Sequence, residues 1–184
     1  MKRQIFLLLA FLAAFTAMAQ VTFPGLSDSQ KQQLLNTRIA VPLPTWVPEG
    51  YTVTKIVAKT GRQIKVENKV LAITYSKKPA YGQAMEFKIE AGFDGLGDLP
   101  YEGSVTVKSK AGTIYLYYEP YDEEGDGKKI KQNGLIMTEW FNIKNLAFDV
   151  VFSSQSENEK LNRTKPKISK ADAIKVLQSM QVLK

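Results

Sequence analysis

The sequence contains no cysteine and no histidine in its 184 residues. Disulfides and thiolate nucleophiles are therefore excluded, as are Ser-His-Asp triads, histidine metal sites and histidine pH switches. A hydrolase without histidine would need a Ser-Lys pair or two carboxylates, and neither Ser-x-x-Lys nor Gly-x-Ser-x-Gly occurs in the chain. We predict that the protein is not an enzyme and assign no catalytic, cofactor-binding or metal-binding residue.

Long apolar runs are also scarce, and the one that exists lies at the N-terminus. Lys2 and Arg3 precede an apolar stretch from Ile5 to Phe15, which Ala17-Met18-Ala19 follows. This pattern is typical of a secretory signal peptide, and the stretch is too short to cross the roughly 30 Å core of a bilayer as a helix. We expect residues 1–19 to be a cleaved signal, so that the mature chain is extracytoplasmic, periplasmic or secreted, and does not span the membrane.

The overall composition is that of an ordinary folded domain. Hydrophobic residues make up 44% and charged residues 23% of the chain, values near the average for globular proteins. The length predicts one domain whose core is large enough to be stable without disulfides. We divide the exported chain into an N-terminal segment, 20–41, and a single domain, 42–184.

Positive charge is concentrated at the C-terminal end. From residue 163 onward Asp172 is the one acidic residue, and the basic residues are Arg163, Lys165, Lys167, Lys170, Lys175 and Lys184. In an exported protein such a patch favours an anionic lipid headgroup, a cell-surface polymer or an acidic protein partner, and we expect no nucleic-acid partner. The alternative is a solvated charge run beside a helix.

Two helices are predicted near the ends of the mature chain. Ser27 and Gln30 have the spacing of a capping box, which predicts a short helix ending at about Asn36. Ser169 and Asp172 suit the start of a second helix, with Ile174, Leu177 and Met180 on its apolar stripe and Ala173 and Leu183 at the edges of that stripe. Pro42, Pro44 and Pro48 predict an extended linker between the first helix and the sheet.

Alternating hydrophobicity predicts strands through most of the remaining chain. The expected strands are 51–59, 63–66, 70–76, 86–93, 104–109, 113–118, 134–141 and 146–152. Lys110-Ala111-Gly112 and Asn142 to Asn145 are short enough to be hairpin connections, which makes the pairing antiparallel. The predicted fold is α+β: an antiparallel sheet of about six to eight strands, a short N-terminal helix, and a C-terminal amphipathic helix packed on the sheet.

Two loops resemble ligand-binding motifs without completing them. The stretch Gly92 to Gly103 lacks the third glycine of a dinucleotide loop, because Pro100 stands at that position. Its apolar residues either pack on the sheet or form an apolar lip. The run Asp122 to Asp126, followed by Gly127, matches the first half of a calcium loop, but Asn133 replaces the closing glutamate. An exposed, charged hairpin tip is the preferred interpretation.

Carboxylates and aromatic residues supply the remaining candidates. Glu86 and Glu90 lie on one strand face with Lys88 between them, which is the usual pattern of a solvated surface. Aromatic residues cluster before the acidic loop and in a later strand, at Tyr115, Tyr117, Tyr118, Tyr121, Trp140 and Phe141. Alternation places Tyr118 on the opposite face from Tyr115 and Tyr117. These aromatics either pack in the core or line a groove for a lipid tail or an apolar peptide.

The segment LPTWVPEGY, Leu43 to Tyr51, resembles the opening of a bacterial extracytoplasmic domain of unknown function that is often linked to anti-sigma-factor anchors. The resemblance extends to the Ile73 to Tyr75 strand, a tryptophan-bearing strand and the helix in ISKADAIKVLQSM. The sequence is also similar to the C-terminal domain of periplasmic sigma-E regulators. The resemblance implies a turn at Pro48 and Gly50, packing of Trp46 and Tyr51, and a non-catalytic sensing or binding role.

We therefore expect a binding or sensing module that recognises an envelope component or a protein partner through a sheet edge or the basic C-terminal surface. The alternative is a carrier that shelters a lipid or another apolar ligand against the sheet. A histidine-free hydrolase is the third and weakest hypothesis.

Cleavage of the signal is directly testable. We expect the chain exported from its own host to begin at Gln20, because small residues at positions 17 and 19 suit signal peptidase. Intact-mass measurement of the exported protein checks this. A chain that retains residues 1–19 would contradict both the cleavage site and the predicted compartment.

Overall fold

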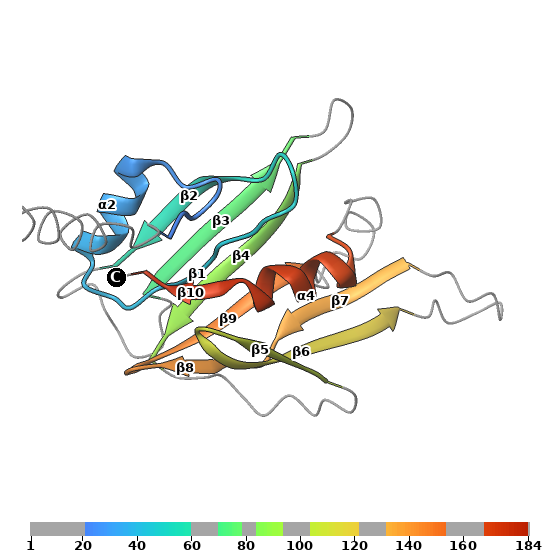
Figure 1. Cartoon of the computed structure of the whole chain (residues 1–184). Helices are drawn as coiled ribbons and strands as arrows, with labels where there is room; N and C mark the ends of the chain where they lie inside the picture. The colour runs from blue at the N-terminus through green and yellow to red at the C-terminus, as the bar shows by residue number, and fades with distance from the viewer. Residues whose placement is uncertain are drawn as a thin grey trace, which may run out of the picture.

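The structure is a computed structural model, and it describes residues 21–59, 70–78, 84–93, 104–121, 132–153 and 168–183. In these residues it contains an eight-stranded antiparallel sheet, a two-stranded sheet and two short helices, so the predicted α+β class is confirmed. Figure 1 shows the C-terminal helix lying across the large sheet. The predicted signal peptide and the strand predicted at 63–66 lie outside the described residues.

Two meanders form the large sheet (Figure 1). The first comprises β2 (Thr52–Ala58), β3 (Leu71–Lys77) and β4 (Met85–Gly92), and the second comprises β5 (Val105–Ser109), β6 (Gly112–Tyr121) and β7 (Gln132–Thr138). β9 (Leu146–Ser153) pairs with β4 on one side and β7 on the other, so it joins the two meanders into one sheet. The hairpin predicted at Lys110 joins β5 and β6 as expected.

The strand predicted at 134–141 is two strands. β7 ends at Thr138, and β8 (Phe141–Ile143) takes over as the partner of the first half of β9. At this change of partner, the buried hydroxyl of Thr138 accepts a hydrogen bond of 2.9 Å from the Val150 amide. A side chain thus supplies the acceptor that a neighbouring backbone carbonyl supplies elsewhere in a ladder.

Both predicted helices form with the predicted N-terminal caps. α2 (Asp28–Asn36) begins after Ser27, whose hydroxyl and the Gln30 side chain complete the capping box. α4 (Lys170–Gln178) begins after Ser169, whose hydroxyl accepts from the Asp172 amide. Gly25, just before α2, has a φ of +77°, and its carbonyl accepts a 2.7 Å hydrogen bond from the Val53 amide. The N-terminal segment thereby covers one end of the β2 edge.

Two segments differ from their predicted structure. Residues predicted as a proline linker include β1 (Pro42–Pro44), and residues predicted as the end of the C-terminal helix form β10 (Met180–Val182). The two strands pair antiparallel, with Leu43 opposite Gln181. α4 ends at Gln178: the carbonyl of its C-cap Ser179 accepts a hydrogen bond from Thr45, and the backbone beyond it pairs with β1 instead of continuing the helix.

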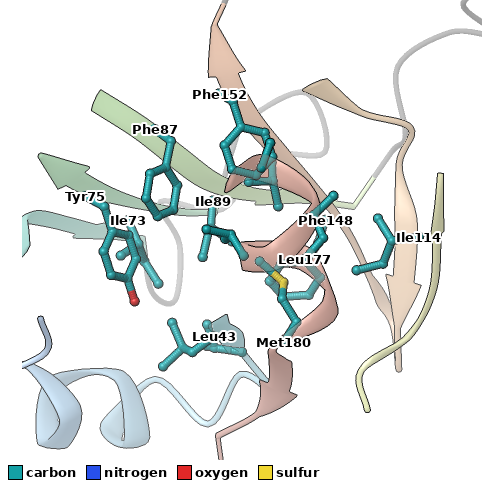
Figure 2. Packing of buried hydrophobic residues seen from close by; sticks show 14 of the residues in the cluster. Leu43, Ile73, Tyr75, Phe87, Ile89, Ile114, Phe148, Phe152, Leu177 and Met180 are labelled. Carbon is teal, nitrogen blue, oxygen red and sulfur yellow. The ribbon is translucent and has the colours of Figure 1, made fainter. Parts of the chain in front are cut away.

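One apolar cluster lies between α4 and the face of the sheet that α4 covers, called here the inner face. Ile73, Phe87, Ile89 and Phe148 contribute from the sheet, and Leu177 from α4 (Figure 2). Each of these five side chains is at most 1% exposed. Burial of large apolar side chains is the main stabilising contribution of such a layer, at about 1.5–3 kcal/mol for each one.

The Thr138–Val150 hydrogen bond can be tested by an isosteric substitution. Thr138→Val keeps the shape and removes the acceptor, so the buried Val150 amide loses its partner. We expect a loss of about 1–3 kcal/mol in the free energy of unfolding. Urea denaturation measures this loss.

Thr138→Ser is the matched control, because it keeps the hydroxyl and removes one methyl group, which costs about 0.8 kcal/mol. If Thr138→Val is no more destabilising than Thr138→Ser, the hydrogen bond does not stabilise the change of strand partner.

Candidate functional site

The most prominent exposed aromatic beside the C-terminal helix is Trp46, which is 37% exposed. The Nζ atom of Lys175, on α4, lies 5.5 Å from the centroid of the Trp46 ring. A cation held over an indole face is attracted by its quadrupole, by about 0.5–1 kcal/mol at exposed sites. These two side chains form what we call the Trp46 surface.

Hydrogen bonds to Ser179 hold the backbone of Trp46 in place. The Ser179 hydroxyl accepts from the Trp46 amide at 3.1 Å and donates to the Val176 carbonyl at 2.8 Å. The Ser179 carbonyl accepts from both the amide and the hydroxyl of Thr45, at 3.1 and 2.9 Å. Since Ser179 is also the C-cap of α4, the same residue caps the helix and fixes the backbone that carries the exposed indole.

The resemblance implied that Trp46 and Tyr51 both pack, and this is right for Tyr51 alone. Tyr51 is 4% exposed, whereas Trp46 is more than a third exposed. The implied turn at Pro48 and Gly50 does form: the Tyr51 amide donates to the Pro48 carbonyl at 3.2 Å, and Gly50 has a φ of +83°. The turn lies between the two aromatic residues, so that the Tyr51 side chain is buried while the Trp46 side chain is exposed. Pro44 and Pro48 restrict the backbone on either side of Trp46. They are the sequence feature that indicates a tryptophan on a restricted backbone.

Two members of the predicted basic patch lie in the described part of the chain. Lys175 contacts Trp46, and the Nζ atom of Lys170 lies 4.6 Å from the centroid of the Tyr118 ring. Both lysines therefore contact aromatic rings at the surface of α4. The other members, Arg163, Lys165, Lys167 and Lys184, lie outside the described residues.

The aromatic cluster of β6 divides between the two faces as predicted. Lys170 of α4 contacts Tyr118, which places Tyr118 on the inner side of the sheet. Tyr115 is 43% exposed on the other face, whereas Tyr117 is 9% exposed. Tyr115 is therefore an exposed aromatic on the sheet face opposite α4, which makes it a control position for the Trp46 surface.

The prediction of a solvated carboxylate face is wrong for Glu90. Glu86 and Lys88 are exposed, but Glu90 is 9% exposed and lies directly opposite Asp149, which is 4% exposed. Strand register thus brings together two carboxylates far apart in the sequence, and each has an interaction partner in the protein. Among the described residues, no three or more Asp, Glu, His or Cys side chains are grouped to hold a metal.

An aromatic layer lies inside the protein against the first meander. Phe87 stacks on Tyr75 with 4.7 Å between ring centroids and contacts Tyr51 at 5.6 Å. Burial raises the pKa of both tyrosines, and the charge of Asp172 raises the pKa of Tyr51 further. Both hydroxyls are buried without a hydrogen-bond partner among the described residues. The sequence analysis did not single out these two side chains as polar groups.

Both loops that resemble ligand-binding motifs fall mainly outside the described residues. This applies to Asp122 to Asp126 and to the glycine-rich stretch after Phe93. Phe93 is described, and its side chain is 48% exposed. In the part of the chain that is described, no helix has the length and apolar character required to cross a membrane.

Comparisons of the chain with protein-family models, with curated proteins and with solved structures find no match. The candidate site therefore rests on the geometry of this chain.

The anchoring role of Ser179 is testable by tryptophan fluorescence. In a Trp140→Phe background, where Trp46 is the single tryptophan, we expect Ser179→Ala to add nanosecond motion to Trp46 in time-resolved anisotropy. The substitution should also lower the free energy of unfolding by about 0.5–1.5 kcal/mol for each hydrogen bond lost.

Ser169→Ala is the matched control at the other end of α4. It removes the N-cap at a cost of about 1 kcal/mol but leaves Ser179 intact, so the anisotropy of Trp46 should not change. Equal motion of Trp46 in both variants would mean that general loosening of α4, rather than the Ser179 anchor, controls the indole.

Proposed function

We propose that the protein is a non-catalytic, extracytoplasmic binding module that recognises an acidic protein partner through the Trp46 surface. The observation that carries this proposal is the exposed indole of Trp46, which is paired with Lys175 and stands on a backbone that Ser179 anchors. Tryptophan is enriched among the residues that dominate binding energy at protein interfaces. A tryptophan whose backbone is already held in place loses less conformational entropy on binding than one on an unanchored segment.

The chemistry of the surface specifies the partner in part. The exposed indole offers apolar area, and the Lys175 ammonium beside it offers a positive charge. A partner that places an apolar side chain against Trp46 and a carboxylate near Lys175 would satisfy both groups. Lys170 lies on the same helix and adds to the positive field that steers an acidic surface toward α4.

The resemblance to extracytoplasmic sensing domains and the predicted signal peptide support a location outside the cytoplasm. In that compartment an envelope polymer or an anionic lipid headgroup also carries negative charge. Stable binding to a membrane surface takes a broad apolar face or a cluster of cations, whereas this surface offers one indole and one lysine beside it, so we prefer a protein. The test below separates these partners.

Site-specific photo-crosslinking tests the proposal. Benzoylphenylalanine at Gln178, which is exposed and lies one helical turn from Lys175, should form one discrete protein adduct in the native host. The same reporter combined with Trp46→Ala should lose that adduct. With the purified partner, Trp46→Ala should weaken binding at least about 30-fold, as expected for a hot-spot residue.

Lys175→Ala should weaken binding less, by about fivefold or below, and its effect should shrink as salt rises. Tyr115→Ala removes an equally exposed aromatic from another part of the surface and should change nothing. An adduct that persists in the Trp46→Ala background would refute recognition through this surface. Binding to phosphatidylglycerol vesicles without any protein adduct would assign the surface to a membrane instead.

Carriage of an apolar ligand stays a second proposal, because one observation favours it. The aromatic layer of Tyr51, Phe87 and Tyr75 contains two buried hydroxyls that have no hydrogen-bond partner in the part of the chain that the structure describes. These aromatics differ from the β6 tyrosines that the sequence suggested as the lining of a groove.

A further inference from the structure

The large sheet ends at β2 on one side and at β5 on the other, and these two edges differ. The N-terminal segment partly covers β2: the Val53 amide donates to the Gly25 carbonyl at 2.7 Å, and the Val53 carbonyl accepts from the Gln30 side chain at 2.9 Å. In the part of the chain that the structure describes, no other strand pairs with the free side of β5. The open edge of the sheet is therefore β5.

The register of the β5–β6 hairpin shows which main-chain groups of β5 face outward. Ser109 pairs with Gly112 across the two-residue turn, and Thr106 is opposite Tyr115. In an antiparallel ladder, pairs that exchange hydrogen bonds alternate with pairs whose N–H and C=O groups point away from each other. Thr106 and Tyr115 form a pair of the second kind, because the Tyr115 carbonyl accepts from the Glu139 amide on the far side of β6, at 2.9 Å.

Two residues of β5 thus offer main-chain groups to an added strand. Thr106 and, two residues later, Lys108 each direct one N–H and one C=O group outward, and both residues are exposed. A polypeptide in an extended conformation carries the same alternation of donors and acceptors, so it can pair with all of these groups. Strand addition to a sheet edge is a recurring way in which proteins bind extended peptides.

The charge of Lys108 restricts which extended segment fits. Lys108 alternates with the buried Val107, so its exposed side chain lies on the outer face of the sheet. A second copy of β5, paired antiparallel, would bring its own lysine to the diagonal position beside Lys108, where like charges repel. Lysine on an edge strand is a common protection against such self-pairing. A carboxylate opposite Lys108 would instead be attracted.

The inner face restricts the neighbouring position. Val107 is 2% exposed and belongs to the apolar cluster that includes the buried side chains of α4. A residue opposite Val107 would point to the same face, where an apolar side chain extends that cluster. The matching segment therefore alternates acidic and apolar residues.

We propose that β5 binds an extended, acidic segment of a protein partner as an added antiparallel strand. The segment forms main-chain hydrogen bonds with Thr106 and Lys108, and it places a carboxylate opposite Lys108 and an apolar side chain opposite Val107. These residues differ from those of the Trp46 surface, and strand addition does not depend on recognition through Trp46.

A synthetic peptide tests the proposal on the exported chain. The probe is acetyl-Glu-Val-Glu-Val-Thr-Val-amide, whose second glutamate and threonine align with Lys108 and Thr106. In NMR titration it should shift the β5 amides with a dissociation constant below about 1 mM and slow hydrogen exchange at the amides of Thr106 and Lys108. The same peptide N-methylated at the second glutamate and the threonine keeps every side chain but should not bind.

Variants of the protein locate the peptide. Thr106→Pro removes an outward N–H that takes no part in the β5–β6 pairing, so it should abolish binding and keep the hairpin. Lys108→Glu should weaken binding at least about tenfold and favour a peptide with lysines in place of the glutamates. Lys55→Glu makes the same charge change at an exposed residue of β2 and is the matched control. Trp46→Ala should leave peptide binding unchanged.

Several results would overturn the proposal. The β5 amides do not shift at about 1 mM peptide, or the N-methylated peptide binds as tightly as the unmodified one. Weaker binding in Lys55→Glu with no change in Lys108→Glu would place the peptide on β2 instead. A parent chain that dimerises and thereby slows exchange at Thr106 and Lys108 would assign the edge to a second copy.

Discussion

The pairing of β1 with β10 is the constraint on which the arrangement of the rest depends. It joins residues just after the first helix to residues at the end of the last, with Leu43 opposite Gln181. The Leu183 amide donates to the Val41 carbonyl at 2.8 Å, and the Ala111 amide donates to the Met180 carbonyl at 3.1 Å. The segment after α4 is thereby tied both to β1 and to the turn between β5 and β6, and α4 is held against the inner face.

The same connection produces both candidate sites. Ser179 stands between α4 and β10, and its bonds to Thr45 and Trp46 hold the exposed indole beside Lys175. In the interior, the aromatic layer of Tyr51 and Tyr75 belongs to the same apolar cluster as the buried side chains of α4. The Trp46 surface and the aromatic layer therefore both depend on the two-stranded ribbon that β1 and β10 form. Loosening that ribbon would affect both.

Local sequence rules predicted what depends on local interactions. Alternation gave the strands of both meanders, and the Ser27–Gln30 capping box and the Ser169 cap gave the starts of both helices. The ribbon was not predictable in this way, because its three-residue strands contain two prolines and their stabilising contacts join residues about 133 positions apart. Met180 fits a helical stripe by spacing, but its backbone pairs with β1 instead.

The candidate sites were harder to predict from the sequence than the fold was. Trp46 was expected to pack, and its exposure follows from where the Ser179 anchor places it. The burial of Glu90 depends on register with Asp149, which a pattern on one strand does not contain. A tyrosine in an alternating strand also gives no sign of whether its hydroxyl finds a partner, because that depends on side chains packed against it from other elements.

Native-state hydrogen exchange tests the central claim that the terminal ribbon opens as one unit. Four amides report on the segment 179–183. The amides of Thr45, Trp46 and Ala111 donate to it, and the amide of Leu183 belongs to it. The account predicts that they exchange through one opening, with the same free energy and the same dependence on denaturant. Unrelated free energies for the Trp46 and Leu183 amides would show that the indole is held independently of the ribbon and would contradict the account.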